Sequence, residues 1–346
     1  MNTRHKPSLA RALAALAAAA ACAGVQAAVI PPGTVLAARQ EMVRNNGAEP
    51  ESLDPAYIES VNAGEITRDL FEGLTSSDHH SNVVPGVAES WKQVDATTWV
   101  FKLRKNAVWS NGTPVTAEDF VYSWRRFLDP KTAAKIATTY GIYLANGLDV
   151  VNGKKPVTDL GVRAIDAQTL EVRTAGPVPF LPALVAVAQY GPQPRAIVEK
   201  FGKDWTKPGN MVSNGAYVLK DWQVNSKVVV EKNPTYWDAA NVQLTRVTFL
   251  CVEDGNADLK LYQSGENDFM QQIAPLLTML PGFVQSLPNF SITALGCGAY
   301  CATDITAGRK GTGPAVRTSS VCLSIAFTPS SVPGFLPLTT SMPLSR

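Results

Sequence analysis

The sequence predicts a mixed α+β (α/β) fold with several β-hairpins, and three observations lead to this prediction. Short runs of alternating apolar and polar residues occur at 99–103, 162–172 and 217–231, which is the pattern of half-buried strands. Apolar residues with helical spacing occur at 65–74 and 116–128. With 346 residues, of which 45% are hydrophobic and 17% charged, the chain can bury the cores of two ordinary domains.

The first residues have the features of an export signal. Three basic residues precede an Ala/Leu-rich run at 12–23, and a small-x-small pattern ends at Ala27. We therefore predict that residues 1–27 are a signal peptide cleaved after Ala27. A membrane-spanning helix would need about 20 strongly apolar residues, whereas this run is shorter and mostly alanine. A lipoprotein anchor at Cys22 is the alternative, but Ala19 stands where a large aliphatic residue is expected.

A strand, a helix and a hairpin are predicted next. Residues 41–46 alternate as a first strand does, and a loop containing Gly and Pro follows. The helix at 65–74 has its apolar residues on one face and is expected to end near Gly73. The strand at 99–103 is followed by an Asn-Gly pair at 111–112, a strong signal for a two-residue hairpin turn.

A capped helix and several short elements complete the predicted fold. The Thr116 side chain can accept from the amide of Asp119, whose carboxylate can accept from the amide of Thr116. Short helices are predicted at 181–187 and 194–201, and residues 221–226 are expected to separate the last two strands.

The charge is unevenly distributed along the chain. Residues 1–27 carry three basic residues and no acid, and residues 276–346 carry four basic residues and one acid. Since the whole chain has a formal net charge of +2, residues 28–275 have a net charge of −4. A mildly acidic body provides no basic surface for nucleic acid or an anionic membrane, and neither is expected as a partner.

Few residues are suited to redox or metal chemistry. Cys251 stands alone in the body, in the apolar stretch 247–252, and is predicted to be a buried strand thiol without a disulfide partner. His79 and His80 follow each other in a turn-like stretch, and adjacent histidines in a strand would face opposite ways. We therefore expect no metal site and no cofactor.

The composition changes after residue 275. The last 71 residues include five charged residues and 32 Ser, Thr, Gly or Pro residues, and no regular periodicity persists there. Low charge is not typical of a solvated disordered tail, and this Ser/Thr/Gly/Pro content is not typical of a packed domain. We expect residues 276–346 to be a disordered or frameshifted tail, and we hypothesise that they are translated out of frame with respect to the ancestral gene. Translating the other two reading frames beyond codon 275 tests this.

Short motifs along the chain carry a resemblance to a known family. They include RDLFEGL at 68–74, PGVAESW at 85–91 and WSNGTPVTAEDFVYSW at 109–124. Further matching segments are 44–47, 53–55, 99–104, 214–217, 233–237 and 264–266. Together they resemble the bacterial extracytoplasmic solute-binding proteins of family 5 (peptide/nickel-binding), and specifically the oligopeptide-binding branch that serves ABC transporters. The match is collinear from about residue 40 to 270, and we interpret most of these motifs as a fold signature.

The resemblance implies a type II periplasmic-binding-protein fold, a two-lobed receptor that closes around its ligand. This chain would contribute a split first lobe (domain I) from residues 28–71 and 196–275. Residues 72–195 would form the family-specific α+β domain (domain II). The family continues with a second lobe, which residues 276–346 do not match.

The resemblance also implies a function and a ligand site. It is that of a non-catalytic, monomeric periplasmic receptor, which binds extended oligopeptides through main-chain hydrogen bonds and delivers them to an inner-membrane ABC permease. Family contacts fall at Glu59, Val61 and Arg68. Glu59 would accept from a peptide amide or basic side chain, and Arg68 would be a structural or carboxylate-facing cation. Both are also compatible with ordinary surface or helix positions. An aromatic contact of the family falls near Ile136, so this side of the pocket is expected to differ.

Several alternatives stay open. Without the second lobe a peptide loses roughly half of its main-chain partners, so we expect weak or absent peptide binding by this chain. The ligand could instead be a dipeptide, murein peptide, nickel chelate or haem, or the chain could be a non-functional gene fragment. An exported hydrolase is the rival class, but the sequence contains no nucleophile elbow, Ser-x-x-Lys constellation, His-rich metal motif or phosphate loop, and we assign no catalytic residue.

Overall fold

The structure is a computed structural model that describes residues 36–78 and 80–271, together with the backbone of 290–293 and 304–307. The predicted signal peptide at 1–27, Cys22 and His79 lie outside the described residues. Of the predicted tail at 276–346, only two short strands are described. These are β11 (Phe290–Thr293) and β12 (Asp304–Ala307), which pair antiparallel.

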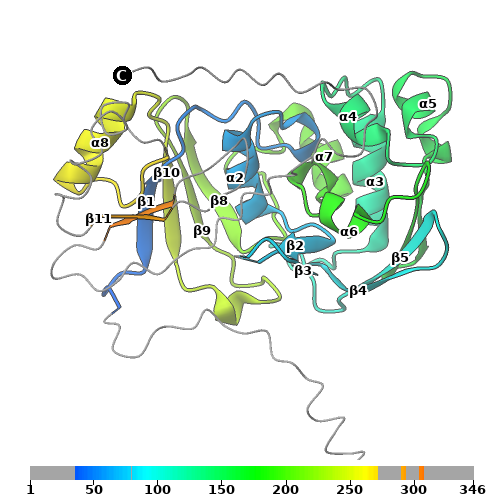
Figure 1. Cartoon of the computed structure of the whole chain (residues 1–346), viewed down its shortest axis with the longest axis horizontal. Helices are drawn as coiled ribbons and strands as arrows, with labels where there is room; N and C mark the ends of the chain where they lie inside the picture. Colours follow the sequence, from blue (N-terminus) through cyan, green and yellow to red (C-terminus); the bar gives the residue numbers. More distant parts are fainter. Residues whose placement is uncertain (1–35, 79, 272–289, 294–303, 308–346) are drawn as a thin grey trace, which may run out of the picture. The chain divides into compact units, whose positions relative to one another are not determined.

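Four strands form the first sheet, in the order β1-β10-β9-β8. β1 (Glu41–Asn45) runs parallel to β10 (Arg246–Leu250), and antiparallel pairing then adds β9 (Lys227–Lys232) and β8 (Tyr217–Gln223). Helix α2 (Val61–Leu70) packs against β8 (Figure 1). This sheet therefore joins strands from both segments that the sequence assigned to domain I.

The second sheet is antiparallel, in the order β4-β5-β7-β6. Its strands are β4 (Ala88–Gln93), β5 (Thr98–Leu103), β7 (Thr169–Arg173) and β6 (Val162–Asp166). Helix α3 (Ala117–Leu128) packs against β6. All of these elements lie within residues 72–195. The domain boundaries themselves stay a prediction.

Shorter elements lie between the strands of the two sheets or follow them. A small hairpin pairs β2 (Thr75–Ser77) with β3 (Val83–Pro85). The remaining α-helices are α4 (Ala137–Gly141), α5 (Gly147–Val151), α6 (Leu181–Leu184), α7 (Arg195–Phe201) and α8 (Gly255–Ser264). The 3₁₀ turns are η1 (Pro55–Tyr57), η2 (Val157–Asp159), η3 (Ala188–Tyr190), η4 (Gly202–Asp204) and η5 (Ala239–Asn241). Among the described residues no helix has the length and apolar character that crossing a membrane requires.

Helix α2 begins and ends earlier than the sequence predicts. It begins after Ser60, whose hydroxyl accepts from the amide of Ala63 (3.1 Å). It ends at Leu70 because Phe71 is extended and its ring packs against buried tryptophans in the core. Gly73 does not end a helix. A Cβ there would lie 2.7 Å from the Val185 carbonyl oxygen, so glycine permits a close backbone approach.

The capping box of α3 is confirmed. Asp119 Oδ2 accepts from the backbone amide of Thr116 (2.7 Å), and both halves of the reciprocal pair are present. The Asn111-Gly112 pair does form a tight turn with Gly112 at φ +85°, but it is flanked by a single bridge rather than by strands. Strand β8 extends to Gln223, into the predicted 221–226 separator, whereas β9 begins at Lys227 as expected. Asn225 takes the left-handed conformation in the tight turn between them.

The prediction for Cys251 is wrong in two respects. The thiol is half-buried rather than buried, and the residue follows β10 instead of lying within it. The cause is its place at the end of the sheet, where its amide donates to the Ser226 carbonyl oxygen (2.9 Å) and where Glu49 contributes to raising the pKa of its thiol.

Candidate functional site

The predicted ligand segment at 58–61 is a turn that leads into α2 and is held by Glu51. One carboxylate oxygen of Glu51 accepts from the backbone amides of Glu59 (2.5 Å) and Ser60 (2.8 Å). The second oxygen accepts from the Ser60 hydroxyl. Burial tends to raise the pKa of Glu51, but the hydrogen bonds from Ser60 and Glu59 outweigh burial and hold this pKa below its usual value. The turn is therefore fixed by an ionised carboxylate.

Glu59 is exposed on this turn and already has a cationic partner. Lys135 Nζ lies 3.0 Å from Glu59 Oε1 and donates to Oε2 at 3.1 Å. Lys135 directly precedes Ile136, where the family's aromatic contact is expected, and Ile136 is half-buried just before α4. An aliphatic side chain therefore occupies this side of the site.

A pocket of about 200 Å³ lies beside α2. Val61 and Arg68, two of the three predicted ligand residues, line it, whereas Glu59 is not among its lining residues. Val61 is 61% exposed, which suits contact with a ligand more than a core position. The structure thus brings Val61 and Arg68 together and leaves Glu59 on the adjoining turn.

Acidic side chains that the sequence analysis did not single out also line this pocket. They include Asp69 at the end of α2 and Glu72 just after it. Burial raises the pKa of Asp69 to about 6, against the opposing charges of Arg44 and Arg68. Burial likewise raises the pKa of Glu72 to about 7. Both residues stand in the motif at 68–74, which we interpreted as a fold signature.

Glu72 is held by aromatic donors from a distant segment. The Tyr236 hydroxyl donates to Glu72 Oε1 (2.5 Å), and the Trp237 indole N–H donates to Oε2 (2.6 Å). The Arg104 guanidinium lies over the Trp237 ring, 3.6 Å from its centroid. These contacts join the end of α2 to the segment after β9, and Tyr236 thereby becomes part of the pocket lining.

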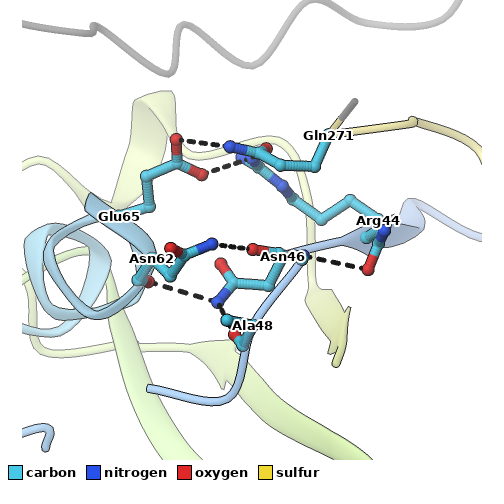
Figure 2. Close-up of polar contacts among 8 residues, drawn as sticks. Arg44, Asn46, Ala48, Asn62, Glu65 and Gln271 are labelled. Carbon is cyan, nitrogen blue, oxygen red and sulfur yellow. Dashed lines mark hydrogen bonds and ion pairs between the residues drawn. The ribbon is translucent and has the colours of Figure 1, made fainter. Parts of the chain in front are cut away.

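The other side of α2 is anchored to β1. Arg44 Nη2 donates to Glu65 Oε2 (2.5 Å) and Gln271 Oε1 (3.1 Å), and Gln271 Nε2 donates to Glu65 Oε1 (3.3 Å) (Figure 2). Asn46 Nδ2 donates to the backbone carbonyl oxygen of Asn62 (3.2 Å), and Asn62 Nδ2 donates to the backbone carbonyl oxygen of Asn46 (Figure 2). Because Glu65 also lines the pocket, this network sets the position of one pocket wall.

Metal chemistry has no support among the residues that the structure describes. No group of three or more His, Cys, Asp or Glu side chains there could hold a metal ion. His80 uses its amide to bond Asp78 (2.8 Å) in an exposed turn. The pocket instead offers one guanidinium, several carboxylates and apolar walls, which suit a small polar ligand with an amine and a carboxylate.

Comparison with known proteins identifies the family. The sequence model of "Bacterial extracellular solute-binding proteins, family 5 Middle" matches residues 82–280. The periplasmic oligopeptide-binding protein OppA of Escherichia coli (strain K12) is 51% identical over 252 residues, covering 72% of this chain and 46% of that protein. The periplasmic murein peptide-binding protein MppA of the same strain is 44% identical over 269 residues, covering 75% and 49%.

Solved structures agree with this assignment. Burkholderia pseudomallei OppA superposes with a TM-score of 0.71 at 44% identity, covering 75% of this chain and 51% of that one. The described residues therefore have the mixed α/β architecture of part of a type II periplasmic-binding-protein fold. The chain spans about half the length of the curated relatives it matches. It belongs to the bacterial extracellular solute-binding proteins, family 5.

Proposed function

We propose that this chain provides the peptide-contacting wall of the substrate-binding component of an ABC-type oligopeptide uptake system. The observation that carries the proposal is the 51% identity to an oligopeptide-binding protein over 252 residues, which are 72% of this chain. In this function Val61 supplies an apolar contact, and Arg68 faces a peptide carboxylate. Glu59 accepts from a peptide amide or a cationic group.

The proposed mode of binding is capture without chemistry. An extended peptide lies along the 58–61 turn and α2, main-chain hydrogen bonds supply affinity, and the pocket receives one side chain. The chain acts in the periplasm as a monomer, is not an enzyme, needs no cofactor, and passes peptides to an inner-membrane ABC permease. The proposed division into a split domain I (28–71 and 196–275) and a domain II (72–195) places α2 in domain I.

Binding by this chain alone is expected to be weak. Its pocket of about 200 Å³ is smaller than the 300–1,000 Å³ or so of a typical ligand pocket, so a tripeptide would stay largely in contact with water. Isothermal titration with a mixed tripeptide pool measures the affinity. We expect dissociation constants in the millimolar range, and micromolar or tighter binding would show this expectation to be wrong.

A paired substitution tests the location of the site. Val61 and Val94 are similarly exposed, at 61% and 58%, but only Val61 lines the pocket. In NMR titrations with millimolar tripeptide, Val61→Asp is expected to weaken binding, whereas Val94→Asp leaves it unchanged. Amide shifts are expected along α2. Absence of any peptide-dependent shift in the unsubstituted chain overturns the proposed function, and a parallel titration with murein tripeptide distinguishes the murein-binding alternative.

A further inference from the structure

The main chain of the turn at Glu59 is held in place by hydrogen bonds to two other segments. Glu51 accepts from its amide at 2.5 Å and from the amide of Ser60 at 2.8 Å. On the other side, Gln189 Nε2 donates to the carbonyl oxygen of Ile58 (3.3 Å). These contacts come from two separate segments, so the backbone of the turn is fixed. What Glu59 can offer a ligand therefore depends on its side chain.

That side chain is engaged at both of its oxygens. Lys135 Nζ is 3.0 Å from Oε1 and donates to Oε2 at 3.1 Å, although 76 positions separate the two residues. The ammonium therefore contacts both carboxylate oxygens to which a cationic group of a ligand would bind. A ligand amine that binds Glu59 competes with Lys135 for these oxygens.

Displacement is feasible because the pair is exposed. The Lys135 side chain is 76% exposed and that of Glu59 is 34% exposed. Exposed pairs are weak, since water and salt compete with the contact and two long side chains must be held in place. Lys135 is consequently a competitor that lowers the affinity for a cation without abolishing it.

We propose that Lys135 is a specificity-determining residue, which occupies the Glu59 carboxylate and reduces the affinity of this site for the cationic amine of a peptide. The inference rests on the proposed function, because it takes Glu59 as a peptide contact. The amine is either a basic side chain or the terminal ammonium. Removing Lys135 strengthens binding of either group, and replacing it with an acid strengthens binding further.

The test compares three substitutions in the full chain. Lys135→Met removes the competitor, and Lys135→Glu adds a second carboxylate beside Glu59. Lys131→Glu is the control, because it changes the net charge by the same amount as Lys135→Glu at a position four residues away. Lys131 is exposed and has no side-chain ion pair among the described residues. The three ligands are Ala-Lys-Ala, Ala-norleucine-Ala and the N-acetylated norleucine peptide, which carries no cation. Affinities are measured by NMR titration at millimolar concentrations.

We expect Ala-Lys-Ala to bind Lys135→Met up to about fivefold more tightly than the unsubstituted chain, and Lys135→Glu more tightly still. Lys131→Glu is expected to have no such effect, and the gain should disappear in about 1 M salt. A gain for Ala-Lys-Ala alone identifies the basic side chain as the competing amine. An equal gain for Ala-norleucine-Ala identifies the terminal ammonium.

Two results overturn the inference while the proposed function stands. One is peptide binding that Lys135 substitutions leave unchanged, and the other is an equal gain for the acetylated peptide, which would indicate removal of bulk rather than charge. A different result, no binding of any peptide to any variant, overturns the proposed function and the inference with it.

Discussion

Arg126 and Asp54 form a two-point ionic contact across 72 positions of the chain. Arg126 Nη1 donates to Asp54 Oδ1 (2.8 Å), and Nη2 donates to Oδ2 (2.7 Å). The indole N–H of Trp205 donates to the same Oδ2 (2.7 Å), and Arg126 also donates to Gln193 (2.6 Å). Three segments that are distant in sequence therefore meet at one buried carboxylate.

Asp54→Ala is expected to destabilise the protein by about 3 kcal/mol, because it leaves the partly buried Arg126 guanidinium without its counter-ion. Urea unfolding followed by circular dichroism measures the change. Asp149→Ala is the control, since its ion pair with Lys155 is exposed at a distance of 3.6 Å, and no measurable change is expected there. Equal effects of the two substitutions would contradict the proposed importance of the buried contact.

Glu51→Gln is expected to loosen the 58–61 turn. The substituted amide has one acceptor oxygen instead of two, so either the two backbone amides or the Ser60 hydroxyl loses its partner. A local loss of about 1 kcal/mol is expected, as for a helix-capping side chain. Hydrogen exchange measures this as faster exchange at the amides of Glu59 and Ser60. In Glu89→Gln, an exposed residue of β4, these amides should keep their original rates.

Glu72 is expected to make stability decline as the pH rises. Its pKa is raised by burial from 4.5 to about 7, so between these pH values the folded protein holds a proton that the unfolded chain has released. The contribution is present near pH 4.5 and is lost as the pH rises through about 7. Glu72→Gln stays neutral and removes this dependence. Urea unfolding across this range, compared with Glu89→Gln, measures it, and parallel profiles of all three proteins would refute the assignment.

Cys251 is expected to be a slow nucleophile. Burial and the neighbouring Glu49 raise the pKa of its thiol to about 12, so little thiolate is present near neutral pH. Alkylation by iodoacetamide at about pH 8 should be roughly a hundredfold slower than for a free thiol. Mass spectrometry of the peptide containing Cys251 follows the reaction at this one site. Glu49→Gln removes the adjacent charge and should accelerate it, whereas an unchanged rate would argue against a role for Glu49.

The local elements were largely predictable because their signals lie within a few neighbouring residues. The alternation at 99–103 and the Thr116–Asp119 capping box correspond to β5 and the start of α3. The limits of α2 were not predictable in this way. Its early end depends on Phe71 packing into a core whose tryptophans, Trp109 and Trp205, come from distant parts of the chain.

The candidate site was predictable only in part. Val61 and Arg68 were found by resemblance, and both line the pocket. Asp69 and Glu72 were missed because carboxylates at a helix end are usually solvated, and their raised pKa values arise from burial that the sequence does not display.

By itself, the sequence determined the family and the order of the local elements, because contiguous motifs encode both of these. Only the tertiary structure decided that β1 pairs with β10, that Tyr236 donates to Glu72 and that Lys135 occupies Glu59. These partners are 76 or more positions apart. Contacts at such separations form only when the whole chain packs, because that packing must offset the entropy lost on closing long loops. The same packing decides how far each charge is buried.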